Sequence, residues 1–262
     1  MIKMKFLPKI NTNIRNKDKI KKTGINYQEF DINYKQLPNL KFNKKNDLQP
    51  LELCGLGSYK KKIKKYLSST LINPENDINL ITECLSLIIK EFMNKTNKNS
   101  ALIHLRTQLP IKNELYNYKI PRWHQDGRYS PFMKKLQYKL TTNIFGKPTR
   151  IHPWKRKYIE LFKKYKLKVY KENKDKLNQF KNQKNFNELS WRKEMIKERK
   201  KIHSILNKQV NRTTNSAYST VYGEHSTIHS EPHITGNRLF MAVLPCSKED
   251  MEWKRTYRRK NN

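Results

Sequence analysis

Apart from one short strand expected near Gln28–Asn33, segments with strand character lie in two stretches of this chain, at about residues 100–150 and 213–245, and a long basic stretch separates them. Residues 151–212 contain 20 Lys and Arg against 6 Asp and Glu, and their apolar residues are spaced mostly as helical faces. The strand pattern therefore breaks after Thr149 and returns at Thr213. Any sheet that uses both stretches has to form across this helical interruption.

The first stretch contains the motif Trp123-His124-Gln125-Asp126-Gly127. Along an extended strand, side chains two residues apart project to one face, so His124 and Asp126 can direct an imidazole nitrogen and a carboxylate oxygen to a single point. Two histidines and one carboxylate with open coordination positions are the ligand set of non-haem Fe(II) oxygenases. Because the chain has 7 His and 22 acidic residues, the pair alone arises easily by chance, and a second imidazole is required.

The missing imidazole is expected in the segment Ile228-His229-Ser230-Glu231-Pro232. His225, His229 and His233 are spaced four apart, which on a helix would align three imidazoles as a zinc site. The β-branched residues before His229 and the proline inside the span make a continuous helix improbable. On a strand His229 is the natural ligand, while His225 is an inward neighbour and His233 lies in a loop.

An apolar strand is expected at 238–244, and it begins with Arg238. A buried guanidinium needs an anionic partner, because leaving it unpaired costs several kcal/mol. Arg238 is therefore a candidate anion-binding residue, and its planar donors suit a carboxylate better than a lysine would. Three further candidates for contact with a substrate are Arg106, Trp123 and Tyr129. A salt bridge at the sheet edge is an open alternative for Arg106, as is core packing for the two aromatic residues.

The order of these motifs resembles the Fe(II)/2-oxoglutarate-dependent dioxygenase superfamily, with its H-x-D…H…R pattern. The resemblance covers both strand-bearing stretches, and it implies an α+β fold with a double-stranded β-helix (jelly-roll, cupin-like) core. It also implies that His124, Asp126 and His229 bind Fe(II). Arg238, nine residues after His229, would bind the far carboxylate of 2-oxoglutarate. The implied reaction consumes O2, releases succinate and CO2, and hydroxylates or demethylates a substrate at a C–H bond.

In such a fold the basic helical stretch is an insertion that leaves the core and returns to it. The chain then has four parts, namely a basic extended arm (1–50), supporting helices with the first half of the core (51–150), the insertion (151–212), and the second half of the core with a basic tail (213–262). Helices are expected at about 57–71 and after Asn73-Pro74, which supply a capping residue and a proline for the first helical position. We expect both helices to support the outer face of the sheet.

The net charge of +35 favours contact with polyanions such as nucleic acid or an anionic membrane surface. A genome rich in A and T is an alternative source of the lysine excess, because Lys, Asn and Ile are over-used together. Aromatic residues of the insertion are Trp154, Tyr158, Tyr165, Tyr170, Phe180, Phe186 and Trp191. Cationic surface with exposed rings holds nucleic-acid strands, whereas burial of the rings in a solvated helical hairpin is equally open.

These features favour a polyanionic or polyanion-associated substrate, such as a nucleic acid or a nucleic-acid-bound protein, although the active-site motifs do not identify it. Hydroxylation of a protein side chain is an equally open alternative. The alternative function is a non-enzymatic, basic nucleic-acid-binding protein with a degenerate core.

Cysteine use and hydropathy bear on the compartment. Cys54, Cys84 and Cys246 are far apart and odd in number, which argues against a disulfide framework and against a Cys-x-x-Cys zinc site. No apolar run approaches the roughly 18–20 residues of a membrane span, and the N-terminus has no apolar signal core. The sequence therefore predicts an intracellular protein without a membrane span.

Overall fold

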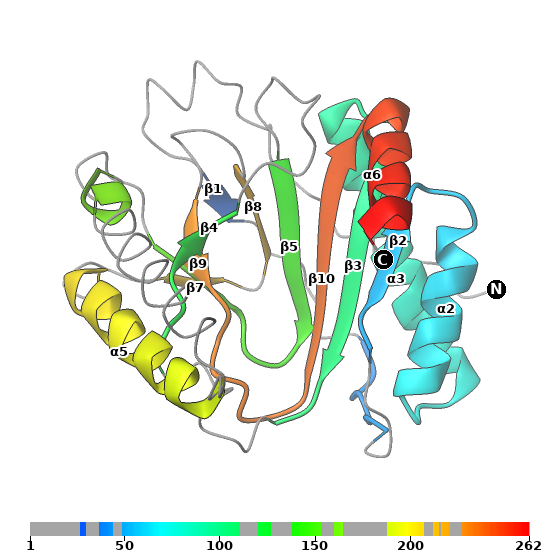
Figure 1. Ribbon diagram of the computed structural model, residues 1–262. Helices are drawn as coiled ribbons and strands as arrows, with labels where there is room; N and C mark the ends of the chain where they lie inside the picture. The colour runs from blue at the N-terminus through cyan, green and yellow to red at the C-terminus, as the bar shows by residue number, and fades with distance from the viewer. Residues whose placement is uncertain are drawn as a thin grey trace.

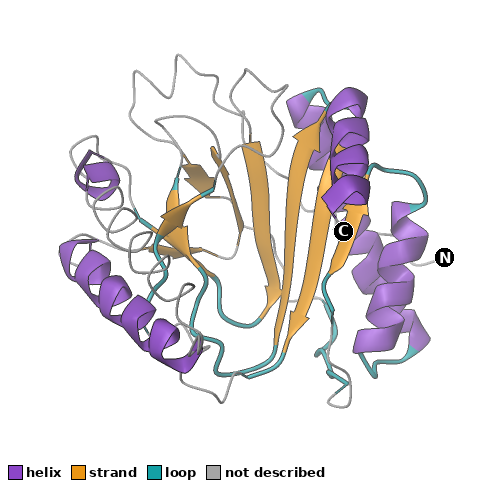
Figure 2. Cartoon of the chain, in the orientation of Figure 1, coloured by secondary structure: helices purple, strands orange, loops and turns teal. Residues whose placement is uncertain are grey.

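The computed structural model of this 262-residue chain combines two antiparallel sheets with helices, so the expected α+β class is confirmed (Figure 1). The structure describes residues 27–29, 37–43, 49–110, 120–126, 138–152, 160–164, 188–206, 212–214, 216–220 and 227–261. Figure 2 shows the strands in two groups with the helices outside them. Among the described strands the two sheets remain separate and do not close into one hydrogen-bonded barrel.

The larger sheet has six strands in the order β1, β8, β5, β10, β3, β2. Their bounds are Tyr27–Glu29 (β1), Ser216–Thr220 (β8), Tyr138–Phe145 (β5), Arg238–Cys246 (β10), Ser100–Gln108 (β3) and Leu51–Cys54 (β2). The central strand β10 pairs along its whole length with β3, from Arg238 opposite Gln108 to Cys246 opposite Ser100. Its other edge pairs with β5. The centre of the sheet thus joins strands from both strand-bearing stretches of the sequence.

The smaller sheet has four short strands in the order β4, β9, β6, β7. Their bounds are His124–Gln125 (β4), Ile228–Ser230 (β9), Thr149–Ile151 (β6) and Arg212–Thr214 (β7). In the β6–β7 pair Ile151 lies opposite Arg212, and these residues are the two ends of the basic stretch. The basic stretch therefore leaves the smaller sheet from one strand and re-enters it at the neighbouring strand.

Two helices, α2 (Tyr59–Thr70) and α3 (Glu75–Thr96), pack on one face of the larger sheet, as the apolar spacing predicted (Figure 1). The sheet side of this core comes from alternate residues of its strands, because successive side chains of a strand point to opposite faces. These residues are Ala101, Ile103 and Leu105 of β3, Leu140 of β5, and Leu239, Met241 and Val243 of β10. The side chains on the opposite face of the same strands therefore take no part in this core.

The start of α3 differs from the prediction. Pro74 precedes the helix instead of forming its first residue, and no side chain caps the first turn. The Asn73 side chain instead accepts a hydrogen bond from the Lys41 backbone N–H (2.7 Å) and donates one to the Asn39 carbonyl (2.9 Å). Through these two hydrogen bonds Asn73 connects the N-terminal arm to the start of α3. Phe42 of the arm is buried in the main core.

Helix α5 (Glu188–Leu206) belongs to the basic stretch and contributes to a second core. In this core Phe162 and Leu206 pack with Trp123, which precedes β4, and with Ile228, the first residue of β9. The basic stretch therefore supports the smaller sheet. The aromatic residues proposed to hold nucleic acid lie outside the described residues, as does the side chain of Trp191.

Helix α6 (Lys248–Asn261) follows β10, and its Met251 packs on Leu102, Leu244 and Cys246. All three cysteines of the chain are free, as their spacing predicted. In the described part of the chain, no helix combines the length and apolar character needed to cross a membrane.

Candidate metal centre

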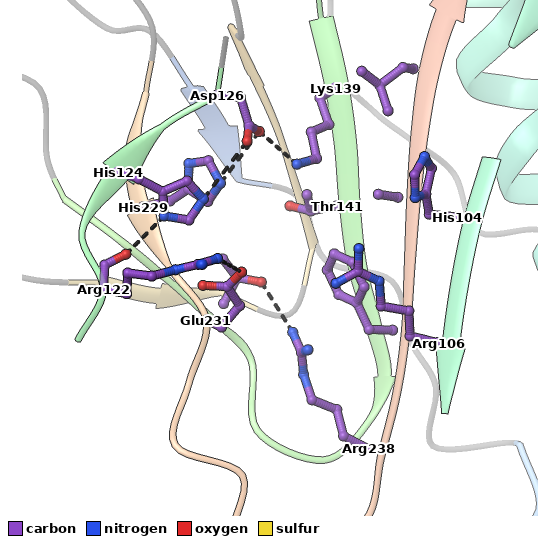
Figure 3. A pocket seen from close by; sticks show the side chains of 14 residues that line it. His104, Arg106, Arg122, His124, Asp126, Lys139, Thr141, His229, Glu231 and Arg238 are labelled. Atoms are coloured by element: carbon purple, nitrogen blue, oxygen red, sulfur yellow. Dashed lines mark hydrogen bonds and ion pairs between the residues drawn. The ribbon is translucent and has the colours of Figure 1, made fainter. Parts of the chain in front are cut away.

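Both sheets contribute side chains to a cavity of about 240 Å³ (Figure 3). The larger sheet supplies His104, Arg106, Lys139, Thr141, Arg238, Phe240, Ala242 and Leu244. The smaller sheet and the loops beside it supply Arg122, His124, Asp126, Thr149, His229 and Glu231. On β3 and β10 these lining residues alternate with the residues that pack against α2 and α3. One face of the larger sheet is thus apolar core, while the other forms a mostly polar cavity wall.

The three predicted metal ligands meet in this cavity. His124 and His229 lie directly opposite each other in the β4–β9 pair, with ring centroids 4.3 Å apart. The Asp126 carboxylate reaches both rings, with Oδ1 3.8 Å from His124 Nε2 and Oδ2 3.4 Å from His229 Nε2. One ligand atom from each residue lies within 4.8 Å of the other two, and among the described residues this is the only such group.

Backbone carbonyls fix the orientation and the tautomer of both imidazoles. His124 Nδ1 lies 2.8 Å from the Arg122 carbonyl oxygen, and His229 Nδ1 lies 3.1 Å from the Thr227 carbonyl oxygen. Because a carbonyl oxygen only accepts hydrogen bonds, Nδ1 carries the proton in each ring. This tautomer directs the Nε2 side of each ring toward the cluster, and both Nε2 atoms lie beside Asp126. A hydrogen bond at the remote nitrogen is the usual arrangement of a metal-binding histidine.

The charge state of the cluster also suits a cation. Burial raises the pKa of Asp126, but His229, Lys139 and His124 together lower it well below its ordinary value. Burial, together with the charge of His124, lowers the pKa of His229 to about 4, although Asp126 opposes the shift. At neutral pH the carboxylate is therefore ionised and His229 is uncharged, which are the forms that bind metals.

Lys139, which the sequence interpretation missed, is the nearest cation to this carboxylate. Its Nζ donates to Asp126 Oδ2 at 2.6 Å, and each side chain is 12% exposed. On β5, Lys139 shares a face with Thr141, whereas Leu140 between them is buried in the helix-side core. This alternation is visible in the sequence, but one lysine carries little information in a chain with 57 Lys and Arg.

Arg238 lies at the start of β10 and is 2% exposed. Its donors contact three neutral acceptors, namely the Lys147 carbonyl (2.9 Å), Gln108 Oε1 (2.6 Å) and Thr149 Oγ1 (3.3 Å). Burial lowers the pKa of Arg238 to about 10, an effect that Glu231 opposes, so the guanidinium stays charged at neutral pH. Within the described chain it forms no ion pair, although a buried guanidinium is expected to have one.

Gly146 allows the β5–β6 turn to approach Arg238. Its φ is +85°, and a Cβ there would collide with the Asn237 carbonyl oxygen and the Arg238 backbone. The carbonyl of the next residue, Lys147, accepts the hydrogen bond from Arg238 Nε. The turn thus brings an acceptor to the guanidinium and holds it at the cavity wall.

The predicted substrate contacts have different outcomes. Arg106 projects from β3 into the cavity, and its Nε is buried without a hydrogen-bond partner among the described residues. Trp123 is 4% exposed, does not line the cavity, and donates from Nε1 to His203 Nδ1 (3.2 Å) on α5. Its placement favours the core-packing alternative. Tyr129 lies outside the described residues.

Two further charged residues of the cavity were not predicted. Glu231, two residues beyond His229, forms an ion pair with Arg122 at 3.0 Å. Period-two spacing along the strand would have placed Glu231 on the same side as His229. Arg122 in the loop before β4 has no comparable signal, because loop residues follow no period.

The cluster passes a simple test of fit for a metal ion. With metal–ligand bonds of about 2.1 Å, two ligand atoms on one ion lie at most about 4.2 Å apart. The carboxylate oxygens already lie 3.4 and 3.8 Å from the imidazole nitrogens. His124, Asp126 and His229 can therefore hold a metal ion after small side-chain adjustments. No family model, curated protein or solved structure matches the chain, so no relative names the metal or the reaction.

Proposed function

We propose that this protein is an Fe(II)- and 2-oxoglutarate-dependent dioxygenase. The observation that carries the proposal is the meeting of His124, Asp126 and His229 in one cavity, with the Nε2 side of both rings directed toward the cluster. Two histidines and one carboxylate leave coordination positions open for a co-substrate and O2. The alternative, a purely nucleic-acid-binding protein, gives no reason for these three side chains to converge.

The strand order supports a double-stranded β-helix core. In a jelly roll, successive strands alternate between two facing sheets except at the fourth and fifth strands, which pair with each other. The first strand then lies beside the last and the third beside the sixth. Counted from β3 to β10, one sheet of this chain runs β3, β10, β5, β8 and the other runs β4, β9, β6, β7, which is that order. The strands β1 and β2 extend the larger sheet at its two edges.

Arg238 supports 2-oxoglutarate as the co-substrate. Its guanidinium is buried in the wall of the same cavity and contacts only neutral acceptors among the described residues. A dicarboxylate that reaches both the metal ligands and Arg238 would supply the missing anionic partner. Planar guanidinium donors match a carboxylate in two parallel hydrogen bonds, which a lysine cannot provide.

When bound, iron and 2-oxoglutarate supply the oxidation of a substrate C–H bond by O2, with succinate and CO2 as products. The protein positions the groups and excludes water. The carbonyls of Arg122 and Thr227 hold the rings of His124 and His229, and Lys139 holds Asp126 through Oδ2. Hydroxylation or demethylation of the substrate remains a prediction. Delivery of a nucleic acid by the basic stretch 151–212 is a prediction as well.

An oxygen-free titration tests the proposal. Fe(II) and 2-oxoglutarate are added to the purified protein, and the weak metal-to-ligand charge-transfer band is recorded. The band is expected in the wild type and in His203→Ala, because His203 packs on Trp123 and does not line the cavity. It should be absent in Asp126→Ala. Equal bands in the two variants, with both shown to be folded, would rule out the assigned ligands.

A further inference from the structure

Among the described residues that line the cavity, positive side chains outnumber negative ones. The cations are Arg106, Arg122, Lys139 and Arg238, and the carboxylates are Asp126 and Glu231. Two of the cations already have carboxylate partners, because Arg122 pairs with Glu231 at 3.0 Å and Lys139 with Asp126 at 2.6 Å. Arg238 is assigned to the co-substrate in the proposed function. No carboxylate of the described lining then remains for Arg106.

Arg106 is directed at the cavity from the strand β3. It lies opposite Phe240 in the β3–β10 pair, and its Nε is buried without a hydrogen-bond partner in the described part of the chain. Its positive charge also lowers the pKa of Arg238, so the two guanidiniums repel each other. A buried donor without an acceptor and a like charge nearby are both costly, and an anion in the cavity would relieve both.

A metal ion would weaken the ion pair of a second cation. Lys139 Nζ lies 2.6 Å from Asp126 Oδ2. An ion bound to Asp126 would take up part of that negative charge and would also repel the Lys139 ammonium. Lys139, which lines the cavity, would then attract a further anion there, while Arg238 binds 2-oxoglutarate.

We propose that the substrate of this site carries an anionic group of the phosphate or carboxylate class, which Arg106 binds and Lys139 contacts when a metal occupies Asp126. The inference rests on the proposed function and deepens it. Room for the group lies over Ala242, a small residue in the wall between Thr141 on one neighbouring strand and His104 on the other. In Figure 3 the side chains of Lys139 and Arg106 both reach into the cavity.

Inorganic phosphate and acetate are suitable probes, titrated without oxygen at constant ionic strength into protein saturated with Fe(II) and 2-oxoglutarate. Binding is followed by calorimetry and by the shift of the charge-transfer band. We expect saturable binding of at least one anion, weakened more than tenfold in Arg106→Gln and partly restored in Arg106→Lys. Arg122→Gln is the matched control, because it removes the same charge from a guanidinium that Glu231 already neutralises. Its effect should be clearly smaller.

A second comparison isolates Lys139. Phosphate should bind the metal-free protein more weakly than the loaded protein, and Lys139→Gln should remove this difference. If the difference persists in Lys139→Gln, the anion binds the ion directly and the role of Lys139 is excluded. The affinity of each variant for Fe(II) is measured alongside, so that loss of metal is not mistaken for loss of anion.

Other outcomes overturn the inference. If Arg106→Gln weakens the binding of 2-oxoglutarate but leaves the binding of phosphate and acetate unchanged, Arg106 binds the co-substrate. If neither anion binds saturably to loaded wild-type protein, the substrate is not anionic, even though the charge-transfer band is present. Absence of the band itself refutes the proposed function, and with it the assignment of any anion site as a substrate site.

Discussion

The two faces of the larger sheet differ sharply, although the same strands build both. On β3, Leu105 is fully buried in the core under α2 and α3, whereas the next residue, Arg106, points into the cavity. On β10, Val243 packs toward the helices and its neighbour Ala242 lines the cavity. The helix-side face stabilises the fold through apolar burial. The cavity face concentrates charge, which costs stability unless ligands or partners compensate it.

This contrast means that adjacent residues of one strand should respond differently to substitution. Side chains on the helix-side face should change the free energy of unfolding, and those on the cavity face should change ligand affinity. Alternation along a strand thus separates stability from function at single-residue spacing.

The largest effect is expected from Leu105→Ala. Removing a fully buried leucine leaves a cavity in the main core, and the free energy of unfolding should fall by about 2–5 kcal/mol. Arg106→Ala, on the other face, should change it by less than about 1 kcal/mol. Denaturant unfolding measures both. Equal losses in the two variants would show that the faces are not separable.

The second-largest effect is expected in the pH dependence of the free energy of unfolding. Burial lowers the pKa of His229 from 6.5 to about 4, so the unfolded chain binds this proton at higher pH than the folded protein does. The contribution of uncharged His229 to stability is complete above about pH 6.5. As the pH falls toward 4, the free energy of unfolding should decrease by roughly 1–3 kcal/mol. Asp126 titrates below this window, because its lowered pKa lies under its ordinary value of 3.8.

Urea unfolding of the metal-free protein at about pH 7.5, 5.5 and 4.5 measures this contribution. In His229→Gln the loss between the first and last pH should be smaller than in the wild type. An unchanged pH dependence in the variant would mean that other groups cause the loss.

The smallest of the three effects is expected from Ala242→Leu, which places a larger side chain in the cavity. Affinity of the loaded protein for phosphate or acetate should fall at least tenfold, or about 1.4 kcal/mol, as measured by calorimetry. Val243→Ala, one residue away, should destabilise the folded protein without changing that affinity. If Ala242→Leu binds these anions normally, the proposed anionic group does not occupy this part of the cavity.

The sequence predicted α2, α3, β3 and β10 because their patterns are local, but it indicated only a basic tail where helix α6 forms. The helix-spaced apolar residues of α3 and the alternating residues of β3 and β10 are repeated signals, and each repeat reinforces the others. Similarly, His124 and Asp126 are two residues apart on an extended segment, so their common direction follows from strand geometry. The pairing of His124 with His229 depends on the register of β4 with β9, which no local pattern reveals.

The contribution of the basic stretch was harder to predict. Its lysines suggested a separate helical segment, yet Phe162 and Leu206 pack on Trp123, the residue next to His124. A deletion of 155–208 to test nucleic-acid binding would therefore expose the core behind the ligand-bearing strand. Substitution of exposed lysines such as Lys193, Lys197 and Lys200 is the better test, because it lowers the charge and keeps this core.

The strand β4 is only two residues long and pairs only with β9 among the described strands. An ion bound by His124 and His229 would join chain positions 105 residues apart, in the manner of a cross-link. Closing so long a loop restricts the unfolded chain strongly, so the ion would contribute to folding as well as to chemistry. Loss of the ion should then open the smaller sheet first, while the larger sheet and its helices stay folded, and a protease should detect that opening before any global probe does.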